Sequence, residues 1–132
     1  MVELRALTPT WLDRMGQGDP LLNSRRMSGP GYIALLDGEP IAAAGLGRIC
    51  GMEFFAWAVI TPKARASKLL MRQLTREAKR RYPIIRDLIK AEVVNAETIN
   101  DKKFCRWLEM LDFKKIPVVR YAWVREGIDN NG

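Results

Sequence analysis

The chain has 132 residues, which fits one compact domain, and 48% of them are hydrophobic, enough to form a core. Its formal charge is +7, which favours anionic partners without identifying them. It contains no histidine, and this excludes a histidine general base, a Ser-His or Cys-His pair and most zinc sites.

The first part of the chain predicts a strand, a short helix and a long loop. Residues 2–7 alternate between apolar and polar and indicate a strand. Thr8 is a candidate N-cap for a helix with Pro9 at its first position, and this helix should end at Gly16 or Gly18. Residues 16–31 are rich in Gly, Pro, Ser and Arg, so we expect a loop with a short helix near 21–26. A loop of this length in a small domain is often functional.

The stretch "YIALLDGEPIAAAGL" gives the clearest local signal. Two apolar runs flank Asp37-Gly38, a preferred pair for a tight hairpin turn, so strand 32–36 should pair antiparallel with strand 40–46. Gly45, Gly47 and Gly51 then predict a second turn. The following "MEFFAWAVI" is almost continuously apolar, which indicates a central strand buried on both faces.

The second half of the chain predicts two helices and two or three strands. A helix begins near Thr61 or Ser67 and ends at Pro83, and Leu70, Leu74, Ala78 and Arg81 fall on one of its faces. "DLIKAEVV" (87–94) indicates a buried strand. Asn100-Asp101 is a candidate cap for a helix over 102–111 whose one face carries Phe104, Trp107, Leu108 and Leu111. "FKKIPVVRYAWVREG" should form one bent strand or two short ones.

These elements follow the order β-α-β-β-β-α-β-α-β. Three meander strands followed by a strand-helix-strand crossover predict an α/β domain with a mixed, mostly antiparallel sheet flanked by helices. We expect one domain over 1–127 and a polar tail over 128–132. No apolar run is long enough to span a bilayer and no signal-like segment opens the chain, so we expect a cytoplasmic protein. Both cysteines, Cys50 and Cys105, are expected to be buried and reduced.

Several motifs in this order resemble the GCN5-related N-acetyltransferase (GNAT) superfamily. The hairpin resembles the family's second and third strands, "AWAVITP" its fourth strand, and "ASKLLMRQLTREAKRRYP" the helix that binds the cofactor. "IKAEVVN" resembles the fifth strand with its asparagine, and Leu111-Asp112-Phe113 stands where the family usually has Leu-Gly-Phe. The likeness covers about residues 1–125 and is greatest to small phage-encoded GNAT-like proteins, which implies a location in the host cytoplasm or in a virion.

The resemblance implies an acetyl-CoA-dependent N-acetyltransferase that acts on an unidentified amine. Amides and cations at a helix start would bind the pyrophosphate, here at Lys63, Arg65, Ala66, Ser67 and Lys68. Unpaired backbone at the end of the fourth strand, Ala58, Val59 and Ile60, would pair with the amide-rich pantetheine arm. Asn95 and Asn100 are further candidate cofactor ligands, although such residues are more often turn and cap residues.

Two carboxylates are candidate bases for the incoming amine, and a water molecule would also serve. Glu53 follows a glycine turn, where it would otherwise simply face water. Glu92 lies in an apolar stretch, where an unpaired carboxylate is costly, so we expect it to have a partner such as an arginine, or a role.

Two departures from the family pattern favour alternatives to an enzyme. The phosphate turn carries no glycine, and an alanine resists the positive φ that glycine accepts. Leu108 stands where many family members carry a tyrosine acid, and Tyr82 and Tyr121 lie in other elements. A catalytically silent GNAT-like scaffold for a protein partner is therefore one alternative.

A nucleic-acid-binding module is the other alternative. Nine Lys or Arg residues lie between 62 and 86 (63, 65, 68, 72, 76, 79, 80, 81 and 86), against one acid, Glu77. On a helix, Arg72, Arg76, Lys79 and Arg80 would form one exposed basic stripe able to neutralise phosphates.

Overall fold

A computed structural model describes residues 2–97, 102–116 and 120–125. Its elements, in chain order, are β1 (Val2–Ala6), α1 (Pro9–Arg14), α2 (Pro20–Arg26), β2 (Gly31–Leu36), β3 (Glu39–Cys50), β4 (Glu53–Ile60), α3 (Pro62–Arg65), α4 (Lys68–Leu88), β5 (Val93–Glu97), α5 (Lys102–Met110), β6 (Lys114–Ile116) and β7 (Arg120–Val124). Within the described residues, these strands form one seven-stranded sheet in the order β1-β2-β3-β4-β5-β7-β6. β4 and β5 are parallel and the other neighbouring pairs are antiparallel, so the predicted α/β fold class is confirmed.

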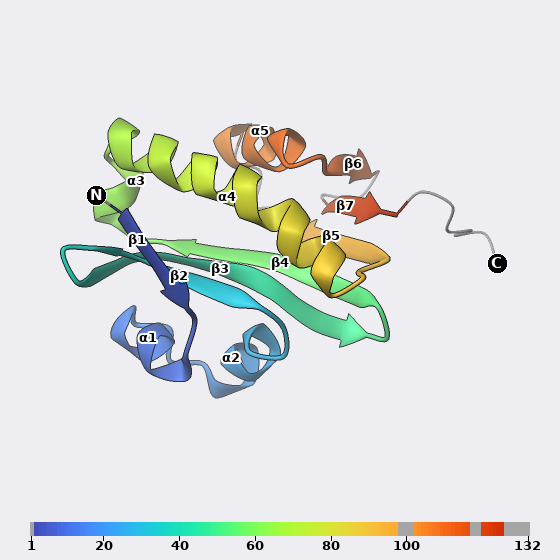
Figure 1. The fold of residues 1–132 in the computed structure, drawn as a ribbon, viewed down its shortest axis with the longest axis horizontal. Helices are drawn as coiled ribbons and strands as arrows, with labels where there is room; N and C mark the ends of the chain where they lie inside the picture. The colour runs from blue at the N-terminus through green and yellow to red at the C-terminus, as the bar shows by residue number, and fades with distance from the viewer. Residues whose placement is uncertain (1, 98–101, 117–119, 126–132) are drawn as a thin grey trace.

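The helices cover the sheet on both faces. α4 and α5 lie on one face, and α1 and α2 lie on the other (Figure 1). On the α4/α5 face, Phe54 and Val94 pack with Tyr82 and Leu108. On the opposite face, Leu12 of α1 packs against Ile33 and other strand residues. The alternation of side chains along each strand therefore supplies two apolar layers, one for each pair of helices.

The hairpin turn between β2 and β3 forms as predicted. Asp37 and Gly38 both have positive φ, at 52° and 80°, as the tight turn requires. The predicted second turn is wrong at two of its glycines, because Gly45 and Gly47 lie inside the long strand β3 and only Gly51 falls in the turn. A Cβ atom on Gly47 would lie 2.6 Å from the carbonyl oxygen of Arg25 and 2.2 Å from the Phe55 ring, so these glycines allow close approach across the strand.

The prediction that Pro83 ends the long helix is wrong. α4 continues through Pro83 to Leu88, so the strand predicted over 87–94 begins only at Val93. The helix ends instead at a left-handed residue, Lys90, with φ 56°, and the Ala91 amide donates to the carbonyl oxygen of Arg86. This is the Schellman arrangement that a glycine usually marks, and a lysine in the glycine's place conceals it in the sequence.

The same arrangement ends α5. Asp112 has φ 71°, and the Phe113 amide donates to the Leu108 carbonyl oxygen over 3.0 Å. Asp112 therefore takes the left-handed position that a glycine would occupy in a Leu-Gly-Phe sequence. Asp and Asn tolerate this conformation better than most residues because their short side chains bond locally.

Three smaller expectations also need correction or confirmation. The short helix in the 16–31 loop is confirmed as α2, with Asp19 accepting hydrogen bonds from the Leu21 and Leu22 amides. Thr8 precedes α1 as predicted, but its side chain makes no cap hydrogen bond. Cys50 is exposed at the end of β3, so its predicted burial is wrong, and the side chain of Cys105 lies outside the described residues. No helix in the described ranges is long and apolar enough to cross a membrane.

Candidate functional site

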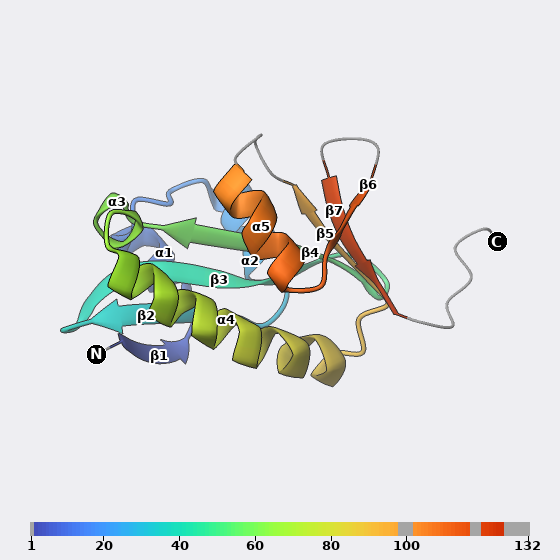
Figure 2. The same ribbon diagram turned by 90° about the horizontal axis from the view of Figure 1, so that it is seen from above.

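The central feature of the site is a slot between β4 and β5. The two parallel strands pair over only three positions, from Glu53 opposite Val93 to Phe55 opposite Asn95. β4 then continues to Ile60 while it stays paired with β3, and Figure 2 shows β4 and β5 running apart. Within the described residues, the β5-facing edge of β4 from Ala56 onward is therefore unpaired. β4 is consequently only half-buried beyond Phe54, which corrects its predicted burial on both faces.

The free edge of β4 presents backbone groups at alternate residues. The Thr61 amide donates to the Ile41 carbonyl oxygen of β3 over 2.9 Å. Because hydrogen-bonding groups alternate in direction along a strand, Val59 also faces β3, whereas Ala58 and Ile60 face the slot. Of the three residues predicted to pair with pantetheine, Ala58 and Ile60 thus present free N–H and C=O groups to the slot. The backbone of Val59 is directed to β3 instead.

The mouth of the slot is formed by two consecutive helix starts. Thr61 caps α3, since its Oγ1 accepts from the Ala64 amide over 3.3 Å. Ser67 caps α4, and its Oγ accepts from the Leu70 amide over 3.2 Å. The amides of Lys68 and Leu69 have no acceptor within the described part of the chain. They are the orphan donors that every helix start leaves, and this helix start follows the end of β4 closely in the chain.

The glycine-free segment between β4 and α4 contains a one-turn helix, α3. Among its described residues, none has positive φ. The difficulty posed by alanine at these positions therefore disappears, because this backbone path is open to any residue. Lys63, Arg65, Ala66 and Lys68 are exposed here, and the three cations make no ion pair with any described residue.

The closed end of the slot holds a carboxylate on the α1/α2 face. Phe54 and Val94 point into the α4/α5 core, so the neighbouring Glu53 and Asn95 point to the opposite face. There the Asn95 Nδ2 donates to the Glu53 Oε1 over 2.7 Å. Each residue was a candidate by itself, and the structure places them together in a half-buried pair next to the point where the strands part. A separation of 42 residues in the sequence hid this pairing.

Glu92 has a different environment from the predicted one. It is exposed, precedes β5, and makes no side-chain hydrogen bond or ion pair among the described residues. Only its backbone makes a structural contact here: the Glu92 carbonyl oxygen accepts a hydrogen bond from the Arg125 amide over 2.8 Å. The expected arginine partner is therefore absent from the described part of the chain, and solvent stabilises the carboxylate. Asn100 lies outside the described residues.

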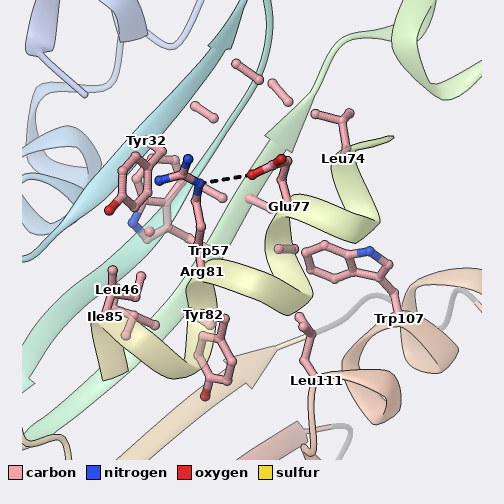
Figure 3. A pocket seen from close by; sticks show the side chains of 18 of the residues that line it. Tyr32, Leu46, Trp57, Leu74, Glu77, Arg81, Tyr82, Ile85, Trp107 and Leu111 are labelled. Atoms are coloured by element: carbon pink, nitrogen blue, oxygen red, sulfur yellow. Dashed lines mark hydrogen bonds and ion pairs between the residues drawn. The ribbon is translucent and has the colours of Figure 1, made fainter. Parts of the chain in front are cut away.

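A cavity of about 130 Å³ lies beneath α4, next to the slot. Its floor combines many small side chains of the sheet with larger ones such as Leu46 and Ile60, and its roof is made by Leu74, Ala78 and Arg81 of α4. Figure 3 shows Arg81 and Glu77 reaching from α4 toward the sheet, with Trp107 approaching from α5 and Leu111 from the turn that follows it. Three of the four residues predicted to share a face of the long helix, all except Leu70, thus form the roof of this cavity. The alanine-rich strand sequences were the only sequence signal for this space.

The α1/α2 face carries an arginine over an indole. The Arg26 guanidinium lies 5.1 Å from the centre of the Trp57 ring, and its Nη1 donates to Gln17 Oε1 over 3.1 Å. Arg26 is only 9% exposed, and burial lowers its pKa. Neither the Arg26 Nε nor the Trp57 Nε1 has a hydrogen-bond partner among the described residues. The 16–31 loop therefore covers β4 beside the slot, where sequence reasoning had placed nothing specific.

Among the described residues, neither Leu108 nor Tyr82 is placed to act as an acid at the slot. Leu108 of α5 is buried at 2% exposure within the core. The Tyr82 hydroxyl is buried with no hydrogen-bond partner among the described residues, and its ring stacks on Phe113 with centroids 5.3 Å apart. Burial raises the Tyr82 pKa, and the nearby Arg86 guanidinium offsets this only in part. A buried phenol with a raised pKa is a weak acid, so it is poorly suited to protonate a leaving group at neutral pH.

The basic stripe of α4 lines a separate, shallow groove. Arg72, Arg76 and Lys79 face Arg106 of α5 across it, and Met71, Thr75, Trp107 and Met110 complete its walls. The four cations make no ion pair within the described ranges. Arg80 lies outside this groove and approaches Glu77 at 3.9 Å. All four predicted members of the stripe are exposed on α4, and three of them line this groove.

Solved structures of other proteins share this fold. An acetyltransferase from Streptococcus agalactiae aligns over 94% of this chain and 98% of its own, with a TM-score of 0.71 and 14% identity. The GNAT domain of PAT from S. lividans aligns over 94% and 90%, with a TM-score of 0.68 and 12% identity. A Bacillus subtilis acetyltransferase solved in complex with CoA aligns over 95% and 99%, with a TM-score of 0.67 and 10% identity.

These similarities establish the fold and nothing finer. No family profile matches the chain, and a search of curated proteins finds no match. The predicted resemblance is thus confirmed at the level of architecture: the chain has the fold of GNAT acetyltransferases.

Proposed function

We propose that the protein is an N-acetyltransferase that uses acetyl-CoA as its acyl donor. The observation that supports this most strongly is the slot, because β4 keeps a free hydrogen-bonding edge that leads to a cationic helix start. An ordinary sheet would pair that edge, since unpaired backbone groups away from water are costly. The site therefore suits a ligand with amides along its length and an anion at one end, which describes CoA.

The residues present fit this ligand group by group. Free amides of Lys68 and Leu69, with the Lys63, Arg65 and Lys68 side chains, would bind the pyrophosphate. The backbone of Ala58 and Ile60 would pair with the pantetheine amides. When bound, the donor supplies an acyl group activated as a thioester. The Bacillus subtilis protein with the same fold binds CoA, which agrees with this assignment.

Glu53 is the base that the geometry favours. Its carboxylate lies beside the point where the strands part, and the hydrogen bond from Asn95 fixes it there. It would accept the proton that an incoming ammonium group must lose, directly or through a water molecule. The amine nitrogen then forms the new C–N bond while the thioester C–S bond breaks. Because Leu108 cannot donate a proton, the leaving thiolate takes its proton from solvent. Glu92 stays a second candidate base, but no contact holds it.

The acceptor would enter from the α1/α2 face, on which Glu53 and Asn95 lie. Residues 16–31 cover that face, so this loop and Arg26 would shape the acceptor site. The chemistry identifies the acceptor only as an amine. A phage origin, Asn100 as a ligand, and a location in a host cytoplasm or virion stay predictions, since they rest on the sequence resemblance alone.

The test of the cofactor site is a charge reversal at the mouth of the slot. Calorimetry with CoA should show that Arg65→Glu with Lys68→Glu abolishes binding, because each reversal replaces an attraction to the pyrophosphate with a repulsion. Lys79→Glu with Arg80→Glu is the matched control, since it changes the net charge equally on exposed sites of α4 away from the mouth. Unchanged CoA affinity in the first variant would refute the assignment, and equal losses in both would reduce it to a general charge effect.

Nucleic-acid binding is the second candidate, favoured by the groove between α4 and α5, whose four cations make no ion pair with any residue that the structure describes. Under this reading, a DNA or RNA oligonucleotide should bind in a strongly salt-dependent way, and Arg72→Ala with Arg76→Ala should lower the salt slope. Under the enzyme proposal, CoA should bind and raise the melting temperature. At a hundredfold excess over its dissociation constant, CoA should add about 2.7 kcal/mol to the free energy of unfolding. A scaffold with neither activity should respond to neither ligand.

A further inference from the structure

The cavity beneath α4 is larger than an acetyl group needs. Its volume is about 130 Å³. Protein interiors seldom leave voids larger than a water molecule, and a dry apolar cavity of roughly 150 Å³ is enough to bind benzene. The space therefore accommodates about six carbon atoms. The cavity is partly open to solvent, but its walls are almost wholly apolar, so water inside it finds few hydrogen-bond partners.

The cavity begins at the point where a bound thioester would lie. Ala56 of β4 and Ala96 of β5 both line it, and they are the first residues beyond the last paired position of the two strands. A ligand whose anionic end lies at the mouth of the slot has its reactive end near this closed end. The acyl group is then adjacent to the cavity, on the sheet face opposite Glu53.

From there the cavity extends across the sheet beneath α4. Its lining includes Ala96 of β5, Ala34 of β2 and Leu4 of β1. Neighbouring strands lie about 4.8 Å apart, so lining residues from β5 to β1 span roughly 19 Å. The space is kept open by small side chains, and Ala78 forms part of its roof. A long, narrow space of this kind fits a linear chain better than a compact group.

Among the polar side chains that line the cavity, Arg81 and Glu77 bond to each other, whereas the Tyr82 hydroxyl and the Trp57 Nε1 have no hydrogen-bond partner among the described residues. The Arg81 Nε donates to Glu77 Oε2 over 3.0 Å, as the dashed line in Figure 3 shows. The Trp107 Nε1 donates to Thr75 Oγ1 over 3.0 Å, away from the cavity. Pantetheine amides are therefore better matched by the free edge of β4, and the cavity is better matched by hydrocarbon.

We propose that this cavity holds the acyl chain of a medium-chain acyl-CoA of about six carbons, so that the site binds such donors more tightly than acetyl-CoA. The inference rests on the proposed function, because it needs the CoA part of the donor in the slot. It goes beyond the proposed function because acetyl transfer alone needs no space for a longer acyl chain.

The test measures binding and needs no acceptor. CoA, acetyl-CoA and hexanoyl-CoA are titrated into the full chain by calorimetry. Each buried methylene should tighten binding by roughly fourfold, so hexanoyl-CoA, with four more methylenes, should bind about two-hundredfold more tightly than acetyl-CoA. Equal affinities for the two donors would overturn this inference and leave the proposed function in place. A chain that binds none of the three would overturn the proposed function, and this inference with it.

Two variants locate the chain. Ala78→Leu fills the roof of the cavity and should remove the advantage of hexanoyl-CoA while acetyl-CoA binding is kept. Ala6→Leu makes the same change at an exposed position of β1 that does not line the cavity, and it should keep the advantage. If circular dichroism shows that Ala78→Leu is unfolded, Ala34→Val tests the far wall. An advantage that survives in the folded variant would show that the chain lies elsewhere and would overturn the inference.

Discussion

Filling the cavity beneath α4 should stabilise the protein even without a ligand. In a closed core cavity, surrounding atoms lose contacts at a cost of about 24 cal/mol per Å³; the 130 Å³ cavity is partly open to solvent, so the corresponding figure of about 3 kcal/mol is an upper bound. Ala78→Leu adds three carbons at the roof, which in full burial would contribute about 2.4 kcal/mol. Because Ala78 is only half-buried, we expect a gain of about 1–2 kcal/mol in the free energy of unfolding.

Urea denaturation followed by circular dichroism measures this gain. The midpoint should rise while the slope of free energy against urea stays constant, since the surface exposed on unfolding hardly changes. Ala6→Leu is the control and should leave the midpoint nearly unchanged. If Ala78→Leu instead destabilises the protein by more than about 1 kcal/mol, the side chain has met a packed interior, since overpacking costs about 1–3 kcal/mol. That result would refute the cavity and the acyl-chain inference together.

Three further changes test other parts of the structure. Glu53→Gln keeps an oxygen that accepts the hydrogen bond from Asn95 Nδ2 but removes the base, so kcat should fall by a factor of about 10²–10⁴ at neutral pH. The loss should shrink at alkaline pH, where the substrate amine deprotonates unaided. An unchanged kcat would exclude Glu53 as the base. Tyr82→Phe should be neutral or stabilising at pH 7, because the hydroxyl is buried without a partner among the described residues. Its folded pKa is raised, so the unfolded state loses its proton first and the wild type should lose stability as pH rises above about 10, by up to about 1.4 kcal/mol per pH unit, whereas the variant should lack that loss. Gly47→Ala should destabilise the protein by about 2 kcal/mol or more in a thermal melt, since its Cβ would meet the Phe55 ring and the Arg25 carbonyl oxygen.

The sequence by itself determined the elements that local chemistry dictates. Asp37-Gly38 specifies its turn because both residues accept positive φ, and the three-to-four spacing of Leu70, Leu74 and Ala78 specifies which face of α4 meets the sheet. The order of these elements was enough to predict the fold class. It was also enough to place cations at the start of a helix that follows a strand.

Local reasoning failed where a distant contact or an uncommon residue decided the structure. α4 passes Pro83 because packing of Tyr82 and Ile85 against the sheet extends the helix, which then ends at a lysine in a position that usually takes glycine. Gly45 and Gly47 stand inside β3 because of close approaches from the 16–31 segment and β4 that no short window of sequence contains.

The functional site was decided by tertiary structure alone. The separation of β4 from β5, the bond between Asn95 and Glu53, and the space between α4 and the sheet each depend on residues far apart in the chain. Residue types set which groups were available, namely carboxylates, cations and small apolar side chains. Their arrangement required the packing of helices on both sheet faces, because packing fixes where strands part and where volume is left unfilled.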